Sequence, residues 1–222
     1  MKTVNLLGRG PSLNCLEVLP DSDLVILAND FDGEISQIKE FSDYLKKQTI
    51  HLVLNMVVHN ADGYNSIGFF ENFNVVKLIR PYLNGIRIPG SSGQSIPLEE
   101  NFLGDHHKEF MFKDGAKYPY DYAGTGIASF AYSILDCDAD VINIIGLDFY
   151  DNLNYEKPNY LVNDKDGRDF VRDFWKPEQM QENIVRLLKG NPNVKVNLHT
   201  ICKNFIDGME DIENLNIIRY DD

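Results

Sequence analysis

The sequence predicts a doubly wound α/β domain with a mostly parallel, Rossmann-like sheet and an inserted lid. Two observations carry this prediction. Near-continuous runs of Val, Ile and Leu recur along the chain, as strands buried on both faces of a parallel sheet require. Segments with helical patterning separate several of these runs, which is typical of βαβ units. The chain has 222 residues, a length that suits one domain, 1–222, with a large core.

Each element is expected from a local pattern. The expected strands are Val4–Leu7, Leu24–Ala28, Ile50–Leu54, Val75–Ile79, Val141–Leu147, Val194–Leu198 and Asn216–Arg219. The expected helices are Glu34–Lys47, Thr125–Leu135 and Glu178–Lys189. The last helix has Pro177 ahead of its first turn and Gly190 after its last residue, which is common helix punctuation.

Two segments lack this periodicity. Pro81 to Tyr120 contains few periodic stretches, and 150–176 is polar and rich in aromatic residues. Long irregular segments in compact domains are commonly functional lids, and disordered segments are poor in aromatic residues. We therefore expect 150–176 to be a lid that orders over a ligand. A surface excursion with a small aromatic core of its own is the alternative.

Charge and cysteine content exclude several classes of protein. The net charge is −13, which argues against general binding to nucleic acid, because such binding needs a basic face. A small anion can still bind at a helix N-terminus. No apolar run approaches the 18 or so residues of a transmembrane helix, and the chain runs from Met1 almost directly into a strand, so we expect a cytoplasmic protein. Three widely spaced cysteines predict free thiols rather than a disulfide framework.

A glycine-rich turn follows the first expected strand. Gly8 and Gly10 permit a close approach of the backbone, Pro11 can open a helix, and Ser12 adds a hydroxyl beside the free N–H groups. Such a turn at the carboxyl end of a first strand is typical of a phosphate cradle. The pattern lacks the third glycine of a dinucleotide fingerprint, since position 13 is Leu. A purely structural tight turn is the alternative.

Two sequence blocks resemble the bacterial sialyltransferases of glycosyltransferase family 42, which sialylate lipooligosaccharide. The first block is Gly-Arg-Gly-Pro-Ser-Leu at 8–13. The second is Thr-Gly-Ile-Ala at 125–128 followed by a strand that ends in Gly-Leu-Asp-Phe-Tyr at 146–150. The same blocks occur in motility-accessory-factor-like proteins and in archaeal hydroxymethylpterin diphosphokinases, which are more distantly similar.

The resemblance implies a CMP-sugar donor, a glycan acceptor, a homo-oligomer, and neither a cofactor nor a metal site. Peripheral association with the inner membrane stays open. The residues implied to hold the nucleotide are Gly8, Arg9, Gly10, Ser12, Asn29, Asn55, Thr125, Gly126 and Asp148. The hydroxyls of Tyr150 and Tyr155 are implied to bind the departing phosphate, where they would stabilise its charge without a metal.

The sequence departs from the family pattern at two places. Arg9 stands where the family usually has Asn. An Arg can still grip a phosphate, and a different donor is the alternative. The stretch 174–177 lacks the histidine that the family uses to deprotonate the acceptor. Asp169, Asp173 or a histidine from elsewhere is then the candidate base, and among these we assign the role to Asp173.

Five histidines are the other candidates for this base, because a neutral imidazole suits that work near pH 7. His51 lies within a strand pattern and is expected to be structural. His59 and His199 follow strands, and His106 and His107 are adjacent in an irregular segment.

Two Asp-x-Asp patterns, at 30–32 and 136–138, are expected by chance in so acidic a chain, and we assign them no metal. A nucleotide-binding module without transferase activity and a diphosphokinase on the same scaffold remain the alternatives for function.

Overall fold

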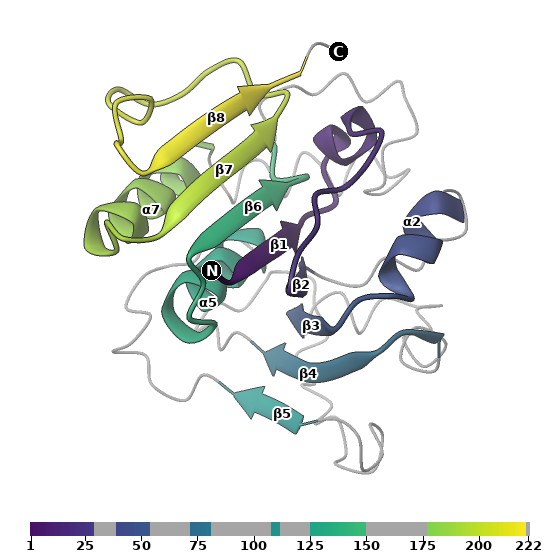
Figure 1. Ribbon diagram of the computed structural model, residues 1–222. Helices are drawn as coiled ribbons and strands as arrows, with labels where there is room; N and C mark the ends of the chain where they lie inside the picture. Colours follow the sequence, from purple (N-terminus) through teal and green to yellow (C-terminus); the bar gives the residue numbers. More distant parts are fainter. Residues whose placement is uncertain (29–38, 54–71, 81–107, 112–124, 150–176, 221–222) are drawn as a thin grey trace, which may run out of the picture.

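The computed structural model describes residues 1–28, 39–53, 72–80, 108–111, 125–149 and 177–220. In this part of the chain eight strands form one sheet in the order β5-β4-β3-β2-β1-β6-β7-β8 (Figure 1). Every neighbouring pair is parallel, so the sheet is entirely rather than mostly parallel here. The strands are β1 (Thr3–Leu7), β2 (Leu24–Ala28), β3 (Ile50–Val53), β4 (Val75–Arg80), β5 (Lys108–Met111), β6 (Val141–Ile145), β7 (Lys195–Thr200) and β8 (Leu215–Arg219).

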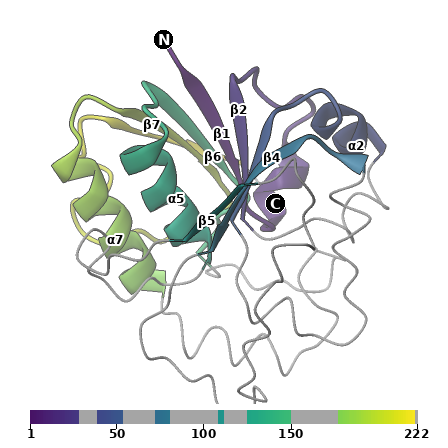
Figure 2. The same ribbon diagram turned by 90° about the horizontal axis from the view of Figure 1, so that it is seen from below.

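Helices cover both faces of the sheet (Figure 2). The helices α5 (Thr125–Asp136) and α7 (Pro177–Gly190) lie on one face. The 3-10 helix η1 (Pro11–Cys15) and the helix α2 (Lys39–Leu45) lie on the other. This three-layer arrangement confirms the doubly wound α/β prediction, because a parallel sheet must be covered on both sides.

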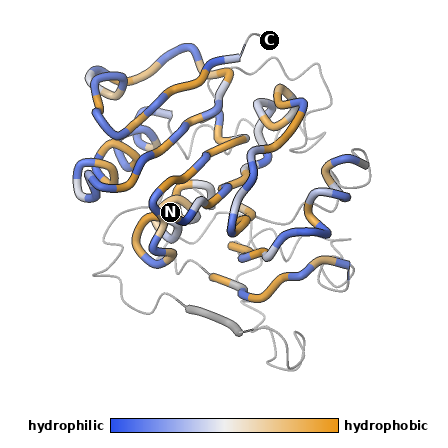
Figure 3. Tube along the Cα trace, viewed as in Figure 1, coloured by the Kyte–Doolittle hydropathy of each residue, from blue (hydrophilic) through white to orange (hydrophobic). Residues whose placement is uncertain are grey.

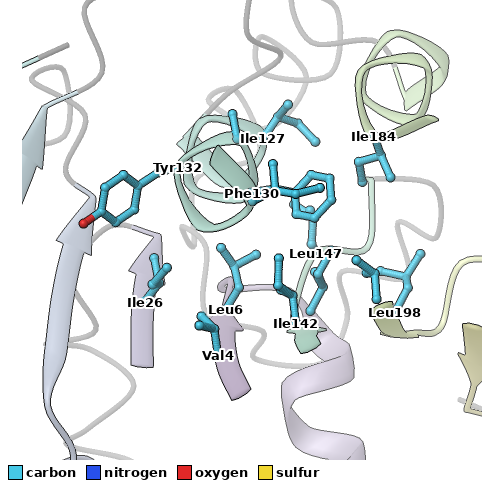
Figure 4. Close-up of a cluster of buried hydrophobic side chains, with 14 of the residues drawn as sticks. Val4, Leu6, Ile26, Ile127, Phe130, Tyr132, Ile142, Leu147, Ile184 and Leu198 are labelled. Carbon is cyan, nitrogen blue, oxygen red and sulfur yellow. The ribbon is translucent and has the colours of Figure 1, made fainter. Parts of the chain in front are cut away.

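The larger core lies between the sheet and the helices α5 and α7 (Figure 4). Phe130 of α5 is fully buried above Leu6 of β1 and Ile142 of β6. Helix α5 is apolar nearly all round, since it has the sheet beneath it and α7 beside it. Each apolar side chain buried in this way contributes about 1.5–3 kcal/mol to the free energy of folding.

Helix α7 is amphipathic and lies at the outside of this layer. Met180, Ile184 and Leu188 recur at every fourth position and are buried, which is the spacing of one helix face. Figure 3 shows hydrophilic and hydrophobic residues mixed along α7, while the central strands β1, β2 and β6 are mainly hydrophobic. The smaller core on the opposite face contains Leu27 of β2 with Phe41 and Leu45 of α2.

A row of asparagine side chains crosses four neighbouring strands. Asn143 of β6 donates to Oδ1 of Asn5 at 2.8 Å, and Asn197 of β7 donates to Oδ1 of Asn143 at 2.8 Å. Asn216 of β8 continues the row to Asn197 at 3.2 Å. The strand register places all four residues opposite one another. The row satisfies polar groups that would otherwise be costly to bury.

The predicted elements are mostly confirmed, with differences at two strands. Strand β6 ends at Ile145 rather than Leu147, because Gly146 has a φ of +77° and turns the chain out of the sheet. Strand β5 lies within the segment 81–120, for which the sequence predicts little regular structure. Four residues are too few to give a periodic pattern of their own.

Two further expectations concern the chain as a whole. Within the described residues, no helix is long and apolar enough to cross a membrane. All three cysteines are free thiols, and Cys137 and Cys202 are buried. The predicted lid, 150–176, lies outside the described residues, and so do the amino-terminal five residues of the predicted helix 34–47.

Candidate active site

The turns that follow β1 and β6 cross in direct contact at the carboxyl end of the sheet. Gly8 donates its N–H to the carbonyl of Ile145 at 2.7 Å, and Gly10 donates to the carbonyl of Gly146 at 2.8 Å. A Cβ on Gly8 or on Gly146 would overlap backbone atoms of the other turn. The glycines at these positions are therefore required by the crossing itself.

This crossing lies at the topological switch point of the sheet. Strand β1 is bordered by β2 on one side and by β6 on the other. The chain leaves β1 toward the face of η1, whereas α5 and α7, which flank β6 in sequence, lie on the opposite face (Figure 2). Ligands of open α/β sheets bind outside the carboxyl ends of the strands at such a point. The fold therefore places the two glycine turns where a ligand site is expected.

Ser12 joins the two turns from the first turn of η1. Its side chain is fully buried, and its hydroxyl oxygen accepts the N–H of Gly146 at 2.9 Å. Its backbone N–H donates to Oδ2 of Asp148 at 2.9 Å. Both groups thus bond to protein in the described residues, so Ser12 fixes the position of the β6 turn relative to β1.

Asp148 connects these turns to the end of β7. Its Oδ1 accepts the hydroxyl of Thr200 at 2.9 Å and the N–H of Ile201 at 3.1 Å. The Thr200 oxygen itself accepts the N–H of Cys202 at 3.0 Å, so its proton points to the carboxylate. The Asp148 side chain is only 7% exposed. The carboxylate therefore ties together three segments that are far apart in sequence.

Two opposing effects act on the ionisation of Asp148. Burial raises the pKa of its carboxyl above the ordinary value, while hydrogen bonds from Ser12, Ile201 and Thr200 act to lower the pKa. Burial is the larger cause. Every described partner of the two oxygens is a donor, which is the environment that an ionised carboxylate needs when it is buried.

The backbone N–H groups of the first glycine turn are largely occupied by protein acceptors. Gly8, Gly10 and Ser12 donate as described above, and Leu13 donates to the carbonyl of Gly10 at 3.2 Å. The expectation of free N–H groups around Ser12 is therefore wrong for these four residues. They are satisfied by the crossing and by Asp148, an arrangement that depends on contacts between residues more than 130 positions apart.

The amino-terminal end of α5 lies beside the same crossing. A Cβ on Gly126 would lie 2.5 Å from a methyl carbon of Leu147, which follows the β6 turn. Thr125, the first residue of α5, is 8% exposed, and its hydroxyl has no hydrogen-bond partner among the described residues. The first turn contains no acidic residue. The positive end of the helix dipole thus lies beside the crossing, and such an end favours an anionic ligand.

The remaining predicted site residues fall into two groups. Arg9 lies in the crossing turn and is partly exposed. The others, Asn29, Asn55, Tyr150, Tyr155 and Asp173, lie outside the described residues. Three of the five histidines, His59, His106 and His107, also lie outside them. The role that the family resemblance implies for each of them stays a prediction.

The two described histidines have different surroundings. Nδ1 of His51 lies 3.0 Å from the hydroxyl of Tyr132, in the layer beneath α5, which fits the structural role expected for this histidine. His199 is buried near the carboxyl end of β7, where its Nδ1 lies 2.7 Å from the hydroxyl of Tyr220 and the two rings stack. Burial lowers the pKa of His199, so the imidazole is neutral near pH 7.

One feature of the site, the support of Asp148 from the end of β7, could not be found from sequence motifs. Thr200 and Ile201 hold Asp148 but follow an expected strand without any recognisable pattern. In the part of the chain that the structure describes, no three His, Cys, Asp or Glu side chains lie close enough together to hold a metal ion. Asp30 and Asp32 lie outside that part of the chain.

Comparison with known proteins gives one structural likeness. The chain is similar to a crystal structure of the sialyltransferase CST-II, a tyrosine-to-phenylalanine variant in complex with CMP. The likeness covers 90% of this chain and 81% of the other, with a TM-score of 0.51 and 14% sequence identity. At this identity the likeness establishes a shared fold. No protein-family model and no curated protein sequence matches the chain.

Proposed function

We propose that this protein is a glycosyltransferase that moves a sialic-acid-like sugar from a CMP donor to a hydroxyl of a glycan, with inversion at the anomeric carbon. The observation that carries the proposal is the fold shared over 90% of the chain with a sialyltransferase that was crystallised with CMP. A function taken from a fold needs support from the site itself. That support comes from the switch point and from the amino-terminal end of α5.

The donor is an anion, and the protein carries a net charge of −13. Binding must therefore depend on local groups that attract negative charge. The end of α5 has this character, because its dipole is positive there and its first turn lacks acidic residues. The Thr125 hydroxyl, which has no partner among the described residues, can add a hydrogen bond to the phosphate. We place the donor phosphate near Thr125 and Gly126, with Arg9 approaching from the crossing turn.

The reaction needs a base on one side of the anomeric carbon and charge stabilisation on the other. The acceptor oxygen attacks the anomeric carbon and loses its proton to a base, while the bond from that carbon to the phosphate oxygen breaks and CMP departs with the electron pair. We assign the stabilisation of the departing phosphate to the hydroxyls of Tyr150 and Tyr155. We assign the role of the base to Asp173. Among the described histidines, His199 is the other candidate for this role, because it lies near the carboxyl end of β7.

Nucleotide selectivity tests this proposal. Thermal melting is measured with CMP, UDP, GDP and ATP at matched concentrations, with and without Mg²⁺. We expect CMP to raise the melting temperature most, because it is part of the proposed donor. A ligand at about 100 times its Kd stabilises the native state by about 2.7 kcal/mol. Stabilisation by a purine nucleotide alone would exclude a CMP donor, and stabilisation by ATP only with Mg²⁺ would favour a diphosphokinase.

A matched pair of variants locates the nucleotide. Thr125→Val keeps the branched shape and removes the hydroxyl, and we expect it to weaken the CMP-dependent rise in melting temperature. Ser133→Ala removes a buried hydroxyl that bonds to Phe130 within α5, two turns from its start. This control is expected to lower the melting temperature of the free protein but to keep the response to CMP. Equal responses in both variants would remove Thr125 from the site.

A further inference from the structure

The carboxylate of Asp148 stands where an exogenous anion would otherwise meet the first turn of η1. The Ser12 N–H points to it at 2.9 Å, and a Cβ on Gly10 would overlap it. Thr200 and Ile201 complete its surroundings from the end of β7. Asp148 is therefore an internal anion, buried and surrounded by donors, at the crossing of the two turns.

We propose that Asp148 is a positioning residue for donor binding: its carboxylate closes the β1 turn on the β6 turn, and the donor phosphate is thereby directed to the amino-terminal end of α5. This inference rests on the proposed function. It assigns Asp148 a role through other residues, rather than the nucleotide contact that the family resemblance implies. It also connects Thr200, which has no place in the sequence motifs, to the binding of the donor.

Three observations support this role over simple packing. Asp148 lies in the turn after β6, and its contacts reach η1, which follows β1, and the end of β7. These segments extend from the three strands at and beside the switch point. Leu147, the preceding residue, lies against Gly126 at the start of α5, so a shift of the β6 turn moves the expected phosphate site directly. The turn on which Asp148 lies also precedes the segment that carries Tyr150. A displacement of about 1 Å between reacting groups can cost about 100-fold in rate.

Only a carboxylate fits the described donors. Ser12 donates from its backbone on one oxygen, and Thr200 and Ile201 donate on the other. An amide at this place would turn its NH2 group toward at least one of these donors. We therefore expect Asp148→Asn to disturb the crossing, even though it preserves shape. Asp148→Ala leaves a small cavity lined by the same donors, which formate has the size and charge to fill.

The experiment measures CMP affinity and thermal melting for the parent protein and for Asp148→Ala, each in sodium formate and in sodium chloride at matched ionic strength. We expect Asp148→Ala to melt cooperatively and to bind CMP about 10-fold to 100-fold more weakly in chloride, because hydrogen bonds to a charged group are lost. We expect formate to restore most of that affinity. Glu210→Ala is the control, because it removes an exposed carboxylate that pairs with Arg219, and formate is expected to change nothing there.

A second pair of variants tests the positioning role if Asp148→Ala does not fold. Thr200→Val removes one donor to Asp148 from a residue that belongs to no expected contact with the nucleotide. We expect it to weaken CMP binding about tenfold or less, while Thr200→Ser keeps the hydroxyl and restores the parent affinity. A role in folding alone predicts that both variants bind CMP like the parent once they are folded.

The outcomes separate this inference from the proposed function. If the parent binds CMP and Asp148→Ala and Thr200→Val bind it equally well, the positioning role is wrong and the proposed function stands. If formate raises the melting temperature of Asp148→Ala without restoring CMP affinity, Asp148 is structural only. If the parent shows no response to CMP, the proposed function fails, and this inference fails with it.

Discussion

The carbonyl group of Gly8 occupies the place where a side chain on Gly146 would stand. The two residues lie at the ends of adjacent parallel strands, so the contact fixes how closely β1 and β6 approach at their carboxyl ends. Gly146 also has a φ of +77°, which directs the chain out of the sheet toward Asp148. The position therefore needs glycine for two separate reasons.

Gly146→Ala tests these two requirements together. A positive φ costs an L-residue about 1–2 kcal/mol, and a methyl group forced against the Gly8 backbone adds about 1–3 kcal/mol. Gly208 is a matched control, since its φ is +78° and a Cβ there would meet nothing within 4 Å. Urea unfolding is expected to show a larger loss of stability for Gly146→Ala than for Gly208→Ala. Equal losses would mean that the crossing relaxes without cost.

The asparagine row predicts that substitutions at its buried centre and at its exposed end differ in their effect on stability. Asn143→Ala removes the central member, which is 5% exposed, and leaves Oδ1 of Asn5 and the amide of Asn197 without their partner in the row. We expect a loss of about 2–4 kcal/mol, because each unsatisfied buried polar group costs about 1–3 kcal/mol. Asn216→Ala, at the exposed end of the row, is expected to change stability by about 0.5 kcal/mol or less. Chemical denaturation of the two variants decides between a stabilising row and an incidental one.

Stability should also fall between pH 6.5 and 4. Burial, with smaller contributions from Lys77 and Lys2, lowers the pKa of His51 to about 4. The unfolded chain then binds a proton below about pH 6.5 that the native state does not bind. The contribution of His51 is therefore fully present above this pH and is lost as the pH falls toward 4. Burial lowers the pKa of His199 as well, which acts in the same direction.

Thermal melting of the parent and His51→Gln across this pH range measures the effect. The variant is expected to lose less stability on acidification than the parent does. The raised pKa of Asp148 acts in the opposite direction, since it favours the native state as the pH falls, but it is common to both proteins and cancels in the comparison. Parallel pH profiles for the two proteins would show that the pKa of His51 is the same in the native and the unfolded states.

The predicted tyrosine pair gives a test of the chemistry. Tyr150→Phe removes a hydroxyl that is expected to stabilise the departing phosphate, and the loss of one such donor typically costs about 100-fold in turnover. Hydrolysis of CMP-sialic acid reports this loss even when the acceptor is unknown. The double variant with Tyr155→Phe is expected to be nearly inactive and still to melt cooperatively. Hydrolysis at the parent rate would make the tyrosines packing residues.

The sequence predicts the strands and helices well where local patterns are strong. The apolar run of Leu24–Ala28 alone predicts a strand, and β2 has those bounds. Helix α7 follows from its spacing and its end signals. The four residues of β5 show no such pattern, and their place depends on pairing with β4. Local sequence patterns predict long, strongly periodic helices and strands. Whether a short segment forms a strand depends on the neighbouring strand with which it pairs.

The candidate site shows the same division. The glycine turns and Thr125 stand out in the sequence, because their residue types are needed locally. The contacts of Asp148 with Ser12 and Thr200 do not, since they join positions 136 and 52 residues apart. From the sequence alone, a carboxylate that follows a strand is equally compatible with binding a ligand and with accepting hydrogen bonds from the protein itself. Only the sheet order, which brings β1, β6 and β7 together, distinguishes the two roles.

The central place of β1 has a consequence for how the protein is made. Its partner on one side, β2, follows at once, but its partner on the other, β6, pairs with it across 138 residues, as Asn5 and Asn143 show. During synthesis β1 therefore has one unpaired edge until most of the chain has left the ribosome. Pairings of such long range close slowly, and an open strand edge invites association with other chains in the meantime. Assembly of the candidate site at the carboxyl end of the sheet is thus a late step in folding, because it needs both β6 and Thr200 of β7.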